Sequence, residues 1–128
     1  MDSFTIVNML EIDDSVSARM QGLEGRFARA RLGSRDVGVS HFRYAPGLRS
    51  TMGHRHGKQE EVYIVVSGAG SILLDGDVHE LRQWDVVRVA PEVVRAFAAR
   101  QDGLELIAIG GPTPEGRDGE MLEVVWPE

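Results

Sequence analysis

Short apolar runs separated by glycine and proline fill residues 36–109, and this punctuation constrains the fold more than any other feature of the sequence. Runs of this length with turn signals between them are typical of an all-β sandwich or barrel. The clearest run is EVYIVV at residues 61–66, because β-branched and aromatic side chains suit a pleated surface. Asp75-Gly76 predicts a two-residue hairpin turn, in which both central residues adopt positive φ. The sequence therefore predicts a mainly β domain.

The turn signals divide this region into at least seven predicted strands. Ser67–Gly70 is expected to end one strand, and Gln101–Gly103 is expected to separate the last two. An apolar segment near the C-terminus, MLEVVW, is expected to dock as a terminal strand or flap. The predicted strands cover residues 37–44, 61–66, 71–74, 78–81, 85–89, 93–98 and 104–109.

The first 35 residues show a less regular pattern. A helix capped by Asp14 or Ser15 is one interpretation, since both residue types accept hydrogen bonds at helix N-termini. Gly22, Gly25 and the alternation in RFARARL favour a turn followed by a strand after residue 24. We predict this strand, within an otherwise irregular N-terminal segment.

Length, charge and composition exclude several classes of protein. The chain is expected to form one domain over residues 1–128, with a core at about 36–110. The net charge of -6 disfavours nucleic acid and anionic membranes as partners. No apolar stretch reaches the ~20 residues of a membrane span and no signal peptide is recognised, so we expect a cytoplasmic protein. Because cysteine is absent, any metal site must use histidine and carboxylate ligands.

The segment His54-Arg55-His56 is the strongest candidate for chemistry. In a strand both imidazoles point to the same face, about 7 Å apart along the chain. We expect residues 57–60 to reverse the chain, so that a carboxylate at the start of the next strand meets the imidazoles across a hairpin. Two histidines and one carboxylate can bind Fe, Mn, Zn, Ni or Cu, among which this ligand set does not distinguish. The alternative is a pair of partly exposed histidines that binds no metal.

These residues resemble the first motif of the cupin family, G-x5-H-x-H-x(3,4)-E-x6-G. The chain departs from the motif in having six residues, rather than five, between the first glycine and the first histidine. The spacing selects Glu61 rather than Glu60 as the matching glutamate. The resemblance implies a small jelly-roll β-barrel of about six to eight strands, with the metal site inside it. The matching residues are Gly47, His54, His56, Glu61 and Gly68.

The second cupin motif, G-x5-P-x-G-x2-H-x3-N, is poorly matched. Alignment through Trp84-Asp85 puts Trp84 at its first glycine and Arg95 at its histidine, which is the fourth metal ligand of the family. A guanidinium has no lone pair for a cation, so Arg95 cannot be a ligand. We expect Arg95 either to neutralise Glu61 in a metal-free protein or to bind an acidic substrate at the barrel mouth beside a metal. The alternative is an arginine that points into solvent.

Three further residues are candidates for lining a substrate pocket. Tyr63 shares a strand face with Glu61, and Phe97 shares one with Arg95, although core packing is the alternative for both aromatic residues. His41 shares a face with Val37 and Val39 and is expected to lie in the barrel or, alternatively, at its rim.

We therefore expect a cupin that binds a divalent transition metal and acts on a small acidic molecule, as an oxygenase or isomerase would. Catalytic residues are not predicted. The alternative is a metal-free cupin that binds or senses a ligand, or has a structural role, with Arg95 in place of the fourth ligand. We also predict a homodimer, because the apolar ends FTIVNML and LEVVW offer strands to cover an open sheet edge.

Overall fold

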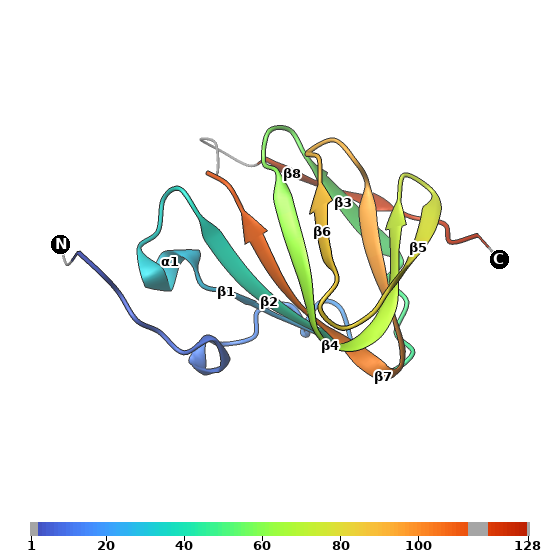
Figure 1. Ribbon diagram of the computed structural model, residues 1–128, viewed down its shortest axis with the longest axis horizontal. Helices are drawn as coiled ribbons and strands as arrows, with labels where there is room; N and C mark the ends of the chain where they lie inside the picture. Colours follow the sequence, from blue (N-terminus) through green and yellow to red (C-terminus); the bar gives the residue numbers. More distant parts are fainter. Residues whose placement is uncertain (1–2, 113–117, 128) are drawn as a thin grey trace.

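Antiparallel strands dominate the computed structural model, which describes residues 3–112 and 118–127 (Figure 1). The predicted all-β class is confirmed. Two short helical elements, η1 (Met9–Glu11) and α1 (Arg29–Leu32), precede β2, and no helix of the described residues is long and apolar enough to cross a membrane. The described strands are β1 (Leu23–Phe27), β2 (Gly38–Tyr44), β3 (Met52–His56), β4 (Glu61–Leu74), β5 (Asp77–Leu81), β6 (Val86–Val89), β7 (Arg95–Gly110) and β8 (Gly119–Glu123).

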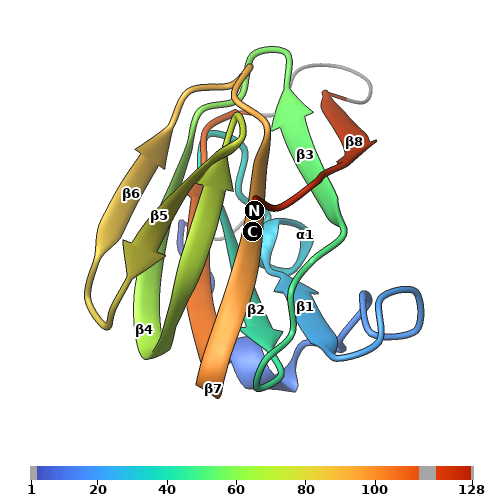
Figure 2. The same cartoon turned by 90° about the vertical axis from the view of Figure 1, so that its right-hand side faces the viewer.

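The two longest strands, β4 and β7, pair with each other from Glu61↔Gly110 to Leu74↔Arg95. Both bend at a shared corner, where their register shifts (Figures 1 and 2). Each strand therefore takes part in two sheets. One sheet is completed by β1, β2 and β6, and the other by β3, β5 and β8. Together they form the curled jelly roll that the family resemblance implies.

Gly68 lies at this corner, where two constraints require glycine. Its φ of 76° is in the left-handed region, and a Cβ at this position would overlap the carbonyl oxygen of Gly103 on β7. The prediction that Ser67–Gly70 and Gln101–Gly103 separate strands is wrong, because both segments bend a strand that continues. A glycine-rich segment suits a strand end and a bulge equally well, and the pairing partner decides between them.

The space between the sheets is filled by apolar side chains from alternate strand positions. Aromatic rings of both sheets meet there: the Phe97 ring centroid lies 4.9 Å from that of Tyr63 and 5.9 Å from that of Tyr44. This packing determines which side chains of β4 point into the barrel. Glu61 lies two residues before Tyr63 on the same face and is positioned by the same packing.

Of two local predictions about how the chain turns, one is confirmed and the other is only partly right. The predicted turn at Asp75-Gly76 is confirmed, with φ of 47° and 92°. The strand predicted after residue 24 is right for β1 but wrong beyond it, because α1 follows. Since β1 and β2 are antiparallel neighbours, the chain must reverse between them, and one helical turn ending at Gly33 does this.

β3 and β4 do not form the predicted hairpin. β3 pairs with β7 at His54↔Arg95 and with β8 from Met52↔Glu123 to His56↔Gly119. The partners of β4 are β5, β6 and β7. Because both edges of β3 are occupied, the connection from β3 to β4 passes from one sheet to the other. The pairing of β8 also confirms that the apolar C-terminal segment docks as a strand.

We expect Gly68→Ala to lower the free energy of unfolding by about 2–4 kcal/mol, because the new side chain meets both an unfavourable φ and a backbone oxygen. Gly111→Ala is the matched control, since nothing lies within 4 Å of a Cβ at that position. Urea denaturation followed by tryptophan fluorescence measures both variants. Equal stability of the two variants would contradict this account of the corner.

Candidate metal centre

His54, His56 and Glu61 converge where β3 ends and β4 begins. The two histidines lie on one face of β3, as residues two apart in a strand do. His54 Nε2 lies 3.1 Å from Glu61 Oε1, and His56 Nε2 lies 3.2 Å from the same oxygen. The imidazole centroids are 5.1 Å apart, with the rings at 88° to each other. The structure thus brings together the three residues predicted to hold a metal.

The donor atoms of this cluster fit a transition metal. They all lie within 4.8 Å of one another. Ligand atoms about 2.1 Å from one ion stand about 3.0–3.4 Å apart, which matches the His–Glu distances of this cluster. Both ring nitrogens of His56 are buried without a hydrogen-bond partner, an arrangement that costs free energy. A metal bound at His56 Nε2 would satisfy one of them.

Glu61 is held in its charged form. Burial alone would raise the pKa of its carboxyl, but the His54 and His56 imidazoles and the Tyr63 hydroxyl outweigh burial and hold that pKa well below its ordinary range. Metal ligation requires this deprotonated form. The His54 side chain is 32% exposed, against 15% for Glu61, so the centre opens to solvent on the side of His54.

Tyr63 adjoins the centre, whereas Phe97 packs in the core. The Tyr63 hydroxyl donates a hydrogen bond of 2.5 Å to Glu61 Oε1 and lies 3.4 Å from His54 Nε2. Burial, and then the charge of Glu61, raise the pKa of Tyr63 well above 10, so the hydroxyl keeps its proton. Phe97 stacks edge-on against Tyr63 within the main core cluster, which is the core-packing alternative considered for it.

Arg95 is fully buried, and its guanidinium is held by main-chain carbonyls. Glu61 forms its ion pairs with the two histidines and not with Arg95. The structure therefore shows neither neutralisation of Glu61 nor an arginine in solvent. Instead, the guanidinium ties the β6–β7 connection to β3. Its terminal nitrogens donate hydrogen bonds of 3.1–3.5 Å to the carbonyls of His54, Val89, Ala90 and Pro91.

His41 lies on the outer face of its sheet, away from the centre. The alternate positions of β2, Phe42 and Tyr44, pack into the core, so the face of His41 is the outer one. His41 Nε2 lies 2.6 Å from Glu105 Oε2, and the histidine is only 3% exposed. The expectation that His41 lines the barrel is not met, because the aromatic residues of the strand fill the interior.

Asp118, which no sequence pattern indicated, reaches the centre from the C-terminal segment. Its Oδ2 lies 3.4 Å from His56 Nδ1. Its carboxylate also accepts hydrogen bonds of 3.0–3.1 Å from the backbone N–H groups of Gly57, Lys58 and Gln59. Burial alone would raise the pKa of Asp118, but these N–H groups and His56 lower it. No sequence signal connects residues about 60 positions apart.

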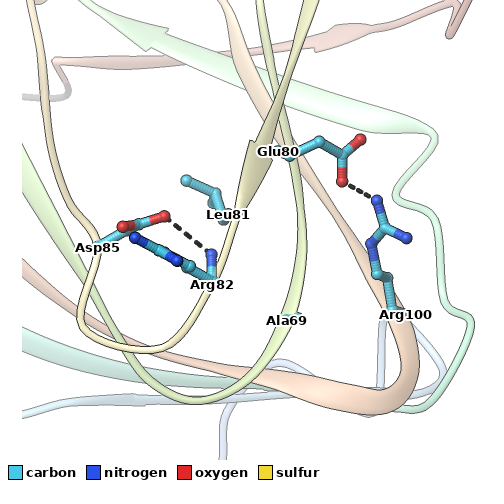
Figure 3. Close-up of a pocket in the computed structure, with 6 residues that line it drawn as sticks. All are labelled: Ala69, Glu80, Leu81, Arg82, Asp85 and Arg100. Carbon is cyan, nitrogen blue, oxygen red and sulfur yellow. Dashed lines mark hydrogen bonds and ion pairs between the residues drawn. The ribbon is translucent and has the colours of Figure 1, made fainter.

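Two surface hollows of the described structure lie away from this centre. The larger, about 430 Å³, opens between β4, β5 and the corner of β7 (Figure 3). Glu80 and Arg100 form an ion pair at its edge, and Asp85 accepts a hydrogen bond from the Arg82 backbone N–H. The smaller, about 340 Å³, lies beside the β4–β5 turn. Neither is lined by a described histidine, so the His54–His56–Glu61 cluster is the better candidate for chemistry.

The fold and the cluster define a jelly-roll barrel with a candidate metal centre at its mouth. The family model described as "Cupin domain" matches residues 40–110, which contain all three clustered residues, and the chain belongs to the cupin family. Among curated proteins, none matches the sequence significantly.

Solved structures that resemble this chain carry different activities. A sugar phosphate isomerase of the cupin superfamily from Silicibacter pomeroyi is 21% identical, with 93% of this chain and 92% of that chain covered and a TM-score of 0.72. The polyketide cyclase RemF from Streptomyces resistomycificus is 14% identical, with 97% and 87% covered and a TM-score of 0.74. A salicylate 1,2-dioxygenase from Pseudaminobacter salicylatoxidans is 16% identical, with 73% and 27% covered and a TM-score of 0.64. These likenesses show the fold alone.

The charge of Glu61 predicts a loss of stability in acid. Its folded-state pKa lies below the ordinary value of 4.5, so the unfolded chain binds this proton more tightly. The stabilisation is present above about pH 4.5 and is lost as the pH falls below it. Urea denaturation with a chelator present, from about pH 6 to pH 3, should show a smaller loss for Glu61→Gln than for the wild type. The same slope in both proteins would contradict the prediction.

Proposed function

We propose that the protein is a metal-dependent cupin enzyme whose ion is held by His54, His56 and Glu61. The observation that carries this proposal is the buried Nε2 of His56, which has no hydrogen-bond partner and lies 3.2 Å from the oxygen that His54 also approaches. Buried polar groups are almost always partnered, so this nitrogen is best explained as a ligand. Fe, Mn, Zn, Ni and Cu all accept two imidazoles and one carboxylate.

Isomerase or oxygenase chemistry suits a centre of this kind. Three protein ligands leave positions open, and a bound metal would polarise a substrate oxygen or supply a site for O₂. Tyr63 keeps its proton and holds Glu61 Oε1 in place through a hydrogen bond. The partly exposed His54 marks the side from which a small molecule enters.

We propose a small acidic molecule as the ligand. The metal and the buried guanidinium of Arg95 create positive potential at the mouth of the barrel, which favours an anion. Arg95 acts at a distance, because carbonyl groups occupy its terminal nitrogens. This local charge is needed because the net charge of the whole chain, -6, repels acidic molecules.

Protein purified without a histidine tag should hold about one transition metal per chain. His56→Ala and Glu61→Gln should each lose most of it, because each removes a ligand. His79→Ala, which changes an exposed histidine on β5, should keep it. Mass spectrometry of the metal content of natively purified protein measures all four.

A metal content well below one ion per chain in the wild type above about pH 7, where imidazole is neutral, would contradict this proposal. It would favour the metal-free alternative, in which His54, His56 and Glu61 form only a polar cluster and the barrel binds or senses a ligand. Loss of metal from His79→Ala would equally count against the assigned ligands.

We also propose a homodimer formed on the outer face of the sheet that contains β1, β2 and β6. The part of this outer face on β4, β6 and β7 is apolar, and an apolar sheet face is normally covered. On this outer face, Val86 of β6 is 63% exposed. Its neighbours on the face are half-buried: Val62 and Ile64 of β4, and Ile107 and Ile109 of β7.

The two apolar ends expected to cover a sheet edge differ in their surroundings. Trp126 packs against Leu73 and Ala96 of its own chain. Phe4 and Ile6 stay largely exposed and are available to a second copy.

Light scattering at micromolar concentration should give twice the 14.1 kDa of one chain. Val86→Lys should shift the protein toward the monomer, because a lysine buried in an apolar contact loses its hydration. Val78→Lys is the control, since Val78 lies on β5 of the other sheet and is 39% exposed. A monomeric wild type would exclude the dimer.

A further inference from the structure

Asp118 lies immediately before β8 and reaches the side of His56 that faces away from Glu61. Its Oδ2 is 3.4 Å from Nδ1, while Nε2 of the same ring is 3.2 Å from Glu61 Oε1. His56 is therefore held between two carboxylates, one at each ring nitrogen. Both contacts have ion-pair length without hydrogen-bond geometry. With 13% of His56 and 8% of Asp118 exposed, little water competes for Nδ1.

The turn that leads from β3 to β4 fixes Asp118. The N–H groups of Gly57 and Lys58 donate to Oδ1 at 3.1 and 3.0 Å, and that of Gln59 donates to Oδ2 at 3.0 Å. Successive N–H groups in a turn form a cradle for an anion. The same turn joins His56 to the strand that starts with Glu61. The Asp118 carboxylate thus contacts both this turn and the imidazole of His56, the residue just before the turn.

A neutral imidazole has one N–H and one lone pair, and the partner of one nitrogen decides which nitrogen keeps the lone pair. We propose that Asp118 positions His56 for metal binding by accepting the Nδ1 proton, which leaves the Nε2 lone pair for the ion. This inference rests on the proposed metal centre. Asp118 does not contact the metal in this arrangement, so it is a positioning residue.

Asp118→Asn tests the tautomer directly. The amide oxygen can still accept from Gly57 and Lys58, while the amide nitrogen, in the place of Oδ2, loses the hydrogen bond from Gln59 and donates to His56 Nδ1. This favours a proton on Nε2, where it blocks a metal. In the metal-free wild type Glu61 competes for a proton on Nε2, so the tautomer is measured in a Glu61→Ala background. Nitrogen NMR above about pH 7.5 distinguishes the two tautomers of a neutral imidazole. We expect Nδ1–H in Glu61→Ala and a shift toward Nε2–H when Asp118→Asn is added.

Titration with Co²⁺, followed by visible absorption, gives the second readout. Asp118→Asn should weaken Co²⁺ binding by about 10- to 100-fold, as loss of an outer partner of a metal ligand typically does. Asp118→Glu keeps a carboxylate and should retain more of the affinity. Glu120→Gln is the matched control, because the Glu120 carboxylate pairs with Arg55 on the outer side of β3 at 2.6 Å. It should change neither the tautomer nor the affinity.

An unchanged His56 tautomer together with unchanged Co²⁺ affinity in Asp118→Asn would overturn the inference and leave the proposed function intact. A wild type that binds no Co²⁺ would overturn the proposed function, while the NMR experiment on metal-free protein would still decide the role of Asp118. Where Asp118→Asn does not fold, the spectrum of Glu61→Ala decides alone. A proton on Nε2 of His56 in Glu61→Ala would overturn the inference.

Discussion

The pairing of β4 with β7 is the interaction on which the rest of the structure depends. Both strands bend at the corner occupied by Gly68, so their outer ends return to the same end of the barrel (Figures 1 and 2). Glu61 begins β4, and Arg95 begins β7. Because His54 pairs with Arg95, β3 joins the same end. A shift in this pairing would separate the carboxylate from the imidazoles.

The charges gathered at the barrel mouth are balanced by different means. Glu61 is stabilised by two imidazoles and a tyrosine hydroxyl, which together outweigh its burial. Arg95 has no carboxylate partner, and a buried charge without partners is strongly unfavourable. Main-chain carbonyls accept from its terminal nitrogens, while its Nε is buried without a partner. Hydrogen bonds to a charged group are stronger than neutral ones, so these contacts offset part of the cost of burial. Arg95, which the motif alignment puts at the family's fourth ligand, contributes positive charge and cannot coordinate an ion.

Some features of the centre were predictable because they depend on local geometry. Two histidines at a spacing of two must share a strand face, and the family motif selects Glu61 over its neighbour. Trp84, aligned with a motif glycine, has a φ of 73°, in the region that glycine favours. The prediction of a hairpin between the histidines and Glu61 was wrong, because strand pairing depends on which sheet edges other segments occupy. His41 was expected in the barrel or at its rim, but it lies on the outer face of its sheet. Alternation shows which residues share a face but not which face is buried.

The sequence by itself determined the β class, the Asp75-Gly76 turn and the three candidate ligands, because these follow from side-chain chemistry and spacings of a few residues. Only the tertiary structure decided that the glycine-rich segments bend strands rather than end them. It also placed Asp118 against His56 and buried Arg95 among carbonyls. These contacts join residues that are distant along the chain, and their free energy comes from burial and close approach. Neither quantity exists until the two sheets have packed together.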